Sequence, residues 1–272
     1  MENNYILGAG PAGLIAAYYF DDFKVIDKKP LGQLNLPFIP GPRLLQATEN
    51  MKEFVKSICP DLELKEEIAI IGFHEDGNVT DTPSKNFKAN YAMKTRGKNK
   101  SESSFMSEGM TEIKHIEIAD YGEDSYKFLF ESLLKIIKDR GQLIETSVEN
   151  IDVFGRKMHL ENGDVLEYWN LISTLNVNLL KKLCPNMKDM PHDLSTSPKC
   201  FYKTEYNEDL DSMMSTKKHP SLWFDYVYSI GTDWTRQTFF RDYIVYESVN
   251  PIKGTHIQGN KILMKFENLP IQ

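Results

Sequence analysis

A run of small residues near the start of the chain, Gly8-Ala9-Gly10-Pro11-Ala12-Gly13, has the spacing of a turn that holds a diphosphate. In such a turn, Gly8 permits a tight change of direction, Gly10 lets the backbone approach the phosphates, and Gly13 lets a helix pack closely on a strand. The phosphates would lie at the N-terminus of that helix, where backbone N–H groups and the helix dipole favour negative charge. The motif predicts a nucleotide-binding turn.

The elements needed to position this turn surround it in the sequence. Residues 5–8 predict a short buried strand, and Phe23 to Asp27 predicts a second one. Pro11 to Phe20 predicts a helix between them, with Pro11 and Ala12 in its first turn. Together they predict a βαβ unit with parallel strands and a right-handed crossover. Asp27 ends the second strand, where a carboxylate accepts hydrogen bonds from ribose hydroxyls.

The rest of the chain alternates between helical and strand-like patterns. Apolar spacing predicts helices over Arg43 to Ile58 and over Ser125 to Arg140, the second followed by Gly141. Asn162-Gly163, between two apolar runs, predicts a hairpin turn. The remaining predicted strands are 66–73, 86–95, 148–154, 157–160, 165–169, 170–175, 222–230 and 237–247, and a short helix is predicted over 178–183. Residues 97–109 are small and polar, which favours a plain surface connection over a lid.

Composition narrows the class of protein. The 272 residues carry a net charge of −7, which disfavours sequence-independent binding to nucleic acid because such binding needs clustered Lys and Arg. No apolar run is long enough to span a bilayer, so no membrane association is predicted. The three cysteines are widely spaced and form no metal-binding pattern, which predicts free thiols in the cytoplasm and no metal site.

Two later segments carry a family resemblance. Residues 25–33 (Val-Ile-Asp-Lys-Lys-Pro-Leu-Gly-Gln) resemble the acidic, basic and glycine pattern that follows the second strand in glutathione-reductase-like FAD proteins. The block from Gly141 to Leu175, with its Val148-Glu-Asn-Ile, Leu160-Glu-Asn-Gly and Leu171-Ile-Ser-Thr-Leu segments, resembles the return to the FAD domain in the amine oxidase, protoporphyrinogen oxidase and UDP-galactopyranose mutase group. The resemblance covers roughly residues 4–45 and 122–183.

This resemblance implies a fold and a cofactor site. It implies an α/β fold, with a Rossmann-like FAD-binding domain, a β-meander and an inserted α+β substrate domain. Residues 1–45 and 122–184 would form the FAD domain, and residues 46–121 and 185–272 the substrate or cap region. FAD would contact Asp27 and, in the glycine turn (residues 8–13), Gly8, Gly10, Pro11, Ala12 and Gly13. By resemblance to the family pattern it would also contact Lys28, Gly32, Gln33, Val148 and Thr174.

Some positions depart from the family pattern. Asp27 is shorter than the usual Glu, and Leu175-Asn176 stands where Leu-Pro is usual. The group also returns to the FAD domain near its C-terminus, and this sequence shows no such segment before Gln272. Asp233-Trp-Thr-Arg236 and Tyr246-Glu247 resemble a mutase stretch in which an arginine meets the substrate diphosphate, so Arg236, with Tyr226, is predicted on the substrate side. A structurally paired Arg236 is the alternative.

Three functions remain open from the sequence. The first is an FAD-dependent oxidoreductase, or a flavin-dependent mutase-like isomerase, acting on a small molecule. The second is a non-catalytic binding protein on the same scaffold, or a flavin site that a partner chain completes. The third is an NAD-dependent dehydrogenase, in which Asp27 would favour NAD over NADP. The oligomeric state is not predicted.

Overall fold

The parallel sheet contains four strands in the order β11-β1-β2-β7. In the computed structural model, which describes residues 3–36, 44–96, 112–187, 199–205, 224–240 and 243–269, the central strand β1 pairs with β2 on one side and β11 on the other. β2 then pairs with β7, also in parallel. The bounds are Asn4–Leu7 for β1, Phe23–Ile26 for β2, Leu143–Ile144 for β7 and Asn170–Ser173 for β11.

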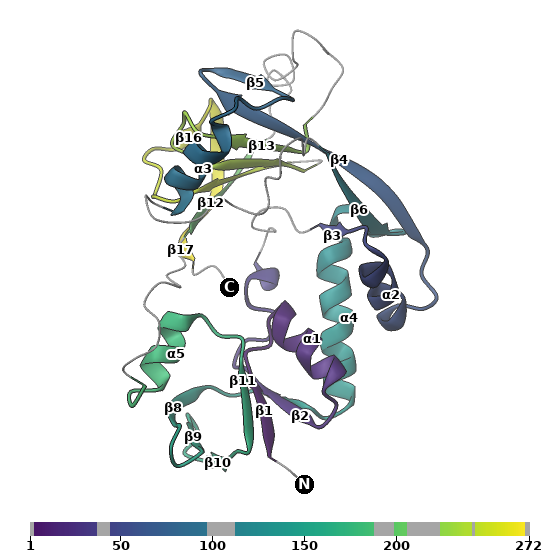
Figure 1. The fold of residues 1–272 in the computed structure, drawn as a ribbon, viewed down its shortest axis with the longest axis vertical. Coiled ribbons are helices and arrows are strands. Elements are labelled where there is room, and N and C mark those ends of the chain that lie inside the picture. The colour runs from purple at the N-terminus through teal and green to yellow at the C-terminus, as the bar shows by residue number, and fades with distance from the viewer. Residues whose placement is uncertain are drawn as a thin grey trace.

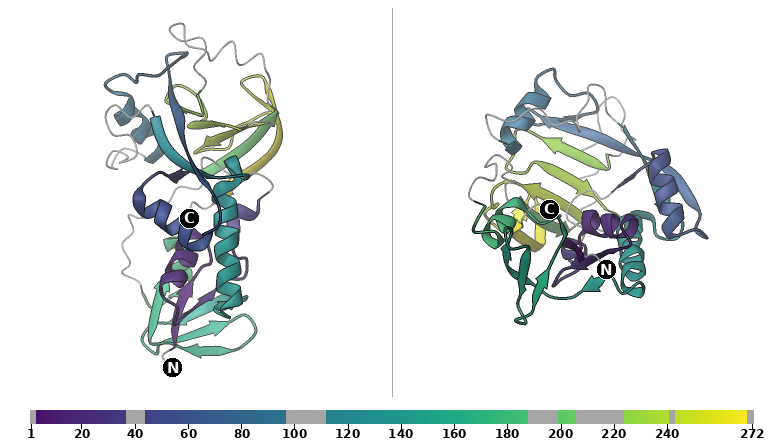
Figure 2. Two further views of the ribbon diagram at one scale, coloured as in Figure 1. Left: turned by 90° about the vertical axis from the view of Figure 1, so that its right-hand side faces the viewer. Right: turned by 60° about the horizontal axis from the view of Figure 1, so that its bottom comes forward.

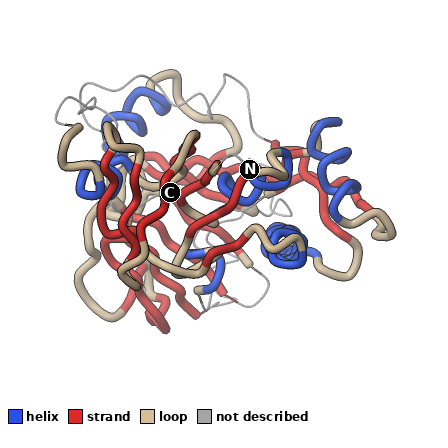
Figure 3. The backbone as a smooth tube through the Cα atoms, turned by 90° about the horizontal axis from the view of Figure 1, so that it is seen from below, coloured by secondary structure: helices blue, strands red, loops and turns tan. Residues whose placement is uncertain are grey.

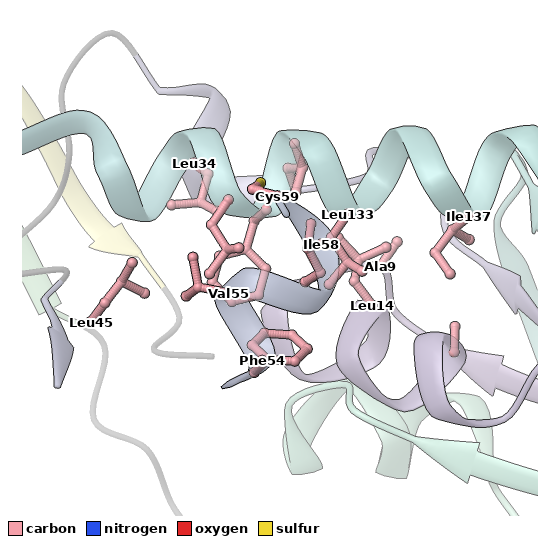
Figure 4. Packing of buried hydrophobic residues seen from close by; sticks show 14 of the residues in the cluster. Ala9, Leu14, Leu34, Leu45, Phe54, Val55, Ile58, Cys59, Leu133 and Ile137 are labelled. Atoms are coloured by element: carbon pink, nitrogen blue, oxygen red, sulfur yellow. The ribbon is translucent and has the colours of Figure 1, made fainter. Parts of the chain in front are cut away.

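Two helices pack on this sheet. α1 (Pro11–Tyr19) follows β1, and α4 (Ser125–Asp139) precedes β7. Figure 4 shows Leu14 of α1 close to Leu133 and Ile137 of α4, and all three side chains are fully buried. α2 (Glu49–Ile58) adds Phe54 and Val55 to the same core. The regular apolar spacing that predicted α4 thus faces α1 and α2.

A three-stranded antiparallel sheet, β10-β9-β8, lies beside the parallel sheet (Figure 1). Its strands are β8 (Val148–Asp152), β9 (Lys157–Leu160) and β10 (Val165–Glu167). α5 (Val177–Leu183) follows β11 and contributes Leu183 to the core that it shares with this sheet. The predicted meander and its Asn-Gly turn are present in the structure.

The third sheet has ten strands and gathers segments that are far apart in the sequence. Its order is β16-β17-β12-β15-β14-β13-β4-β6-β3, and β5 pairs with β4. Figures 1 and 2 show it beyond the end of the α1 and α4 layer, next to the N-terminal end of α4. The bounds are β3 Leu45–Gln46, β4 Leu64–Glu75, β5 Asn78–Thr80, β6 Glu112–Ile118, β12 Lys199–Glu205, β13 Tyr226–Ser229, β14 Arg236–Phe239, β15 Tyr243–Ser248, β16 His256–Ile257 and β17 Asn260–Leu269.

The long strand β4 joins the two sequence halves of this sheet. Residues 64–70 of β4 pair antiparallel with β6, and residues 71–74 pair in parallel with β13. Figure 3, seen from below, shows the strands of the molecule with α4 viewed along its axis. The described part of the chain is therefore a mixed α/β structure with parallel and antiparallel sheets.

Two sequence predictions in this region are wrong. Residues 86–95 form helix α3 (Phe87–Arg96), because Phe87 and Tyr91 are spaced for one helix face and stack with ring centroids 6.2 Å apart. The helix predicted from Arg43 begins instead at Glu49, after Thr48, whose hydroxyl accepts a hydrogen bond from the Met51 N–H at 3.2 Å. Residues 45–46 before this cap form β3.

Four further sequence expectations concern the cysteines, membrane-spanning helices, metal ligands and the segment 97–109. Cys59, Cys184 and Cys200 are free and buried. In the described ranges, no helix combines the length and apolar content needed to cross a membrane. No group of three or more potential metal ligands occurs among these same residues. The segment 97–109 lies outside the described residues.

Candidate functional site

The glycine turn lies at the carboxyl end of β1, between β2 and β11. Gly8 has φ +96°, a backbone conformation that side chains disfavour, and its N–H donates to the Ile26 carbonyl at 3.0 Å. A Cβ on Gly8 would lie 2.7 Å from Thr174 Oγ1, and a Cβ on Gly13 would lie 1.8 Å from the Gly8 carbonyl oxygen. Both glycines are therefore required by close packing around the turn.

The first turn of α1 presents its backbone at this point. Gly10 is the N-cap residue in an extended conformation, and no side chain caps the helix. Pro11 is at the first helical position and has no N–H to satisfy, and the Ala12 side chain is exposed. An anion placed here would receive backbone N–H groups and the positive end of the helix dipole.

Asp27 fastens the glycine turn to the end of β2. Its Oδ2 accepts a hydrogen bond from the Ala9 N–H at 2.6 Å, and its Oδ1 accepts one from the Lys29 N–H at 2.7 Å. Because each carboxylate oxygen can accept about two hydrogen bonds, the carboxylate retains capacity for ribose hydroxyls. This anchoring role was not predicted from the sequence, because it depends on the approach of the two strand ends.

The loop after β2 closes over the turn. The Leu31 N–H donates to the Ala9 carbonyl at 2.9 Å, and Leu31 has φ +66°. Gly32 has φ +43° and begins the short helix η1 (Gly32–Asn35), which also contains Gln33. The predicted residues Asp27, Gly32 and Gln33 thus belong to one loop that starts beside the glycine turn.

Lys28 connects this loop to the antiparallel sheet. Its ammonium lies 2.7 Å from Glu161 Oε2, and both side chains are about half exposed. Glu161 follows β9, whose last residue pairs with Val148 of β8. Val148 is half-buried and packs in the core beneath the three-stranded sheet. Glu161 was missed by sequence reasoning, because no local pattern links residues so far apart in the chain.

Thr174 ties the end of β11 to the glycine turn. Its hydroxyl donates to the Leu7 carbonyl at 2.9 Å and lies 3.1 Å from the Gly8 carbonyl. Its backbone N–H also donates to the Leu7 carbonyl, at 2.9 Å. Thr174 therefore fixes the turn, and the structure brings it together with the predicted residues of the glycine turn and Asp27.

The two predicted substrate-side residues lie in the ten-stranded sheet, away from the glycine turn. Arg236 of β14 forms an ion pair with Glu247, its direct partner on β15. Glu247 is 1% exposed, so this is a buried pair. Tyr226 of β13 is also buried, and it lines a cavity of about 320 Å³ beside β4 and β6. The geometry gives Arg236 a structural partner, and its substrate role stays a prediction.

Comparisons with known proteins concern the fold. No protein-family model matches the sequence, and no curated protein matches it. Reduced UDP-galactopyranose mutase aligns with a TM-score of 0.65 at 9% identity, over 99% of this chain and 83% of that chain. The chain shares the fold of this enzyme. A CLA-producing fatty acid isomerase from P. acnes aligns with a TM-score of 0.58 at 11% identity, over 98% and 85% of the two chains.

A third enzyme has the same fold over a slightly smaller region. Wild-type putrescine oxidase bound to putrescine aligns with a TM-score of 0.53 at 10% identity, over 91% of this chain and 75% of that chain. UDP-galactopyranose mutase is one of the enzymes in the group that the sequence resembles. At these identities the three comparisons support a common fold, and chemistry has to be argued from the residues of the site.

Lys94 of α3 lines a second cavity, of about 370 Å³. Its ammonium donates to the Ser229 carbonyl at 2.8 Å and to the Trp234 carbonyl at 2.5 Å. Burial lowers the pKa of Lys94 to about 8, and the nearby Asp233 carboxylate partly opposes this shift. A lysine in the unfolded chain titrates near pH 10.5.

This depressed pKa gives a testable pH dependence. Between pH 8 and pH 10.5 the unfolded chain binds more protons at Lys94 than the folded protein does, so this residue makes stability rise with pH. We expect the stability of wild type relative to Lys94→Met to rise by about 1 kcal/mol from pH 7.5 to 9.5, a value discounted for solvent screening because the side chain is only partly buried. Urea denaturation of both proteins measures it, and parallel pH profiles would contradict it.

Proposed function

We propose that the chain is an FAD-dependent enzyme that holds the ADP half of FAD at the glycine turn. The observation that carries this proposal is the uncapped N-terminus of α1, which stands beside Gly8 and the Asp27 carboxylate. A diphosphate would lie at the first turn of α1, and the adenosine ribose would lie near Asp27. The fold shared with the mutase, the isomerase and the oxidase supports the proposal.

The residues of this site have separate tasks in the proposal. The peptide groups of the α1 N-terminus bind phosphate oxygens, and Thr174 and Asp27 keep the glycine turn in the required shape. Val148 would meet the adenine through its backbone, and the Lys28–Glu161 ion pair would close the loop beside it. When bound, the flavin supplies the capacity to accept or return electrons.

The proposal also divides the chain by task. Residues 1–45 and 122–184 bind the nucleotide, and residues 46–121 and 185–272 bind the substrate. The ten-stranded sheet supports this division, because its strands come from residues 45–118 and 199–269. The substrate is a small molecule, and the reaction is an oxidation or an isomerisation.

The substitution Ala12→Asp tests the diphosphate site. Residue 12 is exposed at the second position of α1, so an aspartate fits there and interacts favourably with the helix dipole. The same negative charge repels a diphosphate. We expect unchanged or slightly higher stability and at least about tenfold weaker FAD binding, measured by the visible spectrum of purified protein and by titration of the apoprotein with FAD.

Asn50→Asp is the matched control, because Asn50 is exposed at the second position of α2. It adds the same charge at a helix N-terminus that the proposal does not use, so FAD binding should not change. Equal FAD affinity in Ala12→Asp and wild type would place the diphosphate elsewhere. A wild-type protein that is colourless and does not take up added FAD would overturn the proposal for the chain alone.

A further inference from the structure

The cavity beside Tyr226 has an unusual charge distribution. Its lining residues come from the N-terminal end of α4, from β3, β4 and β6, and from β13 and β14. Figure 1 shows the N-terminal end of α4 next to β3 and β6. Four carboxylates line the cavity, and no lysine or arginine is among its described lining residues. They are Glu67, Glu117, Glu123 and Asp225.

Two buried polar side chains of the cavity wall have no hydrogen-bond partner among the described residues. His115 is 8% exposed and its Nδ1 is unpartnered, and Thr238 is 2% exposed and its Oγ1 is unpartnered. Buried polar atoms are nearly always satisfied by protein, water or ligand. These two atoms therefore point to a polar group that enters the cavity.

The hydrogen-bonding character of the wall indicates which group this is. His115 Nε2 lies 3.5 Å from Glu117 Oε1, which leaves the unpartnered Nδ1 open to a hydrogen bond with a ligand. Glu67 lies directly opposite His115 in the β4–β6 pair, which adds another acceptor on this face. Four carboxylates, which only accept hydrogen bonds when ionised, favour a ligand that donates.

Asp225 adds an electrostatic argument. Its Oδ2 accepts a hydrogen bond from the Ile70 N–H at 2.6 Å, and burial raises the pKa of its carboxyl group. A cation in the cavity would favour the ionised carboxylate and offset its desolvation. Apolar and aromatic groups, among them Ile68 and Phe239, form the rest of the wall and suit the carbon portion of such a ligand.

We propose that this cavity is a binding site for a small organic ammonium compound. The ammonium donates to the carboxylates and to His115 Nδ1, and its hydrocarbon portion packs on the apolar wall. The site uses neither the glycine turn nor Asp27, so it does not depend on FAD binding.

Three compounds of one shape and different charge test this proposal. Benzylammonium, benzyl alcohol and benzoate are titrated separately at pH 8 into the full chain without added FAD, and their affinities are measured by ligand-detected NMR. We expect benzylammonium to bind at least about tenfold more tightly than the other two. Arg43 and Arg241 are next in sequence to the lining residues Leu44 and Phe240, and both arginines lie outside the described residues. Benzoate therefore tests whether the cavity binds an anion instead.

A pair of adjacent glutamates on β4 supplies the matched variants. Glu67→Gln removes an exposed carboxylate of the cavity wall, and it should weaken benzylammonium binding about threefold to tenfold without affecting benzyl alcohol. Glu66→Gln removes an exposed carboxylate that pairs with Lys52 and does not line the cavity. It should leave binding unchanged.

Other outcomes would overturn the proposal. Equal affinities for the three compounds would show that charge is not recognised, and tighter binding of benzoate would assign the cavity to anions. Equal weakening by both glutamine variants would show a general effect of protein charge. Because no FAD is added, these outcomes are independent of the spectral test of the flavin site.

Discussion

Replacing Gly13 with alanine is expected to destabilise the folded protein by more than about 3 kcal/mol. The new Cβ would lie 1.8 Å from the Gly8 carbonyl oxygen and 3.1 Å from Thr174 Oγ1. The closest of these atoms belongs to the backbone, so no side-chain rotation relieves the clash. α1 would have to move away from β1, which would disrupt the glycine turn and its proposed phosphate site together.

Urea denaturation followed by circular dichroism measures this effect. Gly231→Ala is the control, because a Cβ there meets no atom within 4 Å and Gly231 has no positive φ. It should change the free energy of unfolding by less than about 0.5 kcal/mol. If Gly13→Ala were as stable as this control, α1 and β1 would pack less closely than the structure indicates.

The second large effect is expected at the buried ion pair of the ten-stranded sheet. Arg236→Met leaves the Glu247 carboxylate, which is 1% exposed, without its countercharge. Removing one partner of a buried pair costs about 3–5 kcal/mol. Thermal or urea denaturation should therefore show a severe loss of stability. Lys28→Met, which breaks an exposed pair with Glu161, should have little effect.

A double variant separates structural pairing from substrate binding at this position. Arg236→Met combined with Glu247→Gln removes both charges, so it should recover part of the stability lost in Arg236→Met alone. Recovery would show that Arg236 acts mainly by neutralising Glu247. Wild-type stability in Arg236→Met, accompanied by lost substrate binding, would instead support the substrate role predicted from the sequence.

The local parts of the fold were predictable because their signals are local. The glycine spacing and the two short strands around it specify the βαβ unit, and α1 and β2 occur within one residue of the predicted bounds. The Asn162-Gly163 turn likewise specified the hairpin of β9 and β10. The apolar face of α4 was visible because its residues repeat with the helical period.

The remaining features depend on contacts between distant segments. The parallel pairing of β13 with β4 has no local sequence signal, because the two strands are about 150 residues apart in the chain and neither has a pattern that names its partner. Residues 86–95 were assigned to the wrong element because a few aromatic side chains fit a strand and a helix almost equally well. Similarly, the cavity beside Tyr226 joins residues of α4 and of five strands, and no single segment shows its acidic lining.

The central position of β1 has a consequence for how the protein is made. β2 follows β1 closely in the chain, but β11, the other neighbour of β1, begins only at Asn170. A nascent chain leaves the ribosome with its N-terminal end first, so this edge of β1 stays unpaired until β11 has been translated. During that interval the edge is open to pairing with other strands. The nascent chain is therefore expected to need protection by chaperones until residue 173 has emerged.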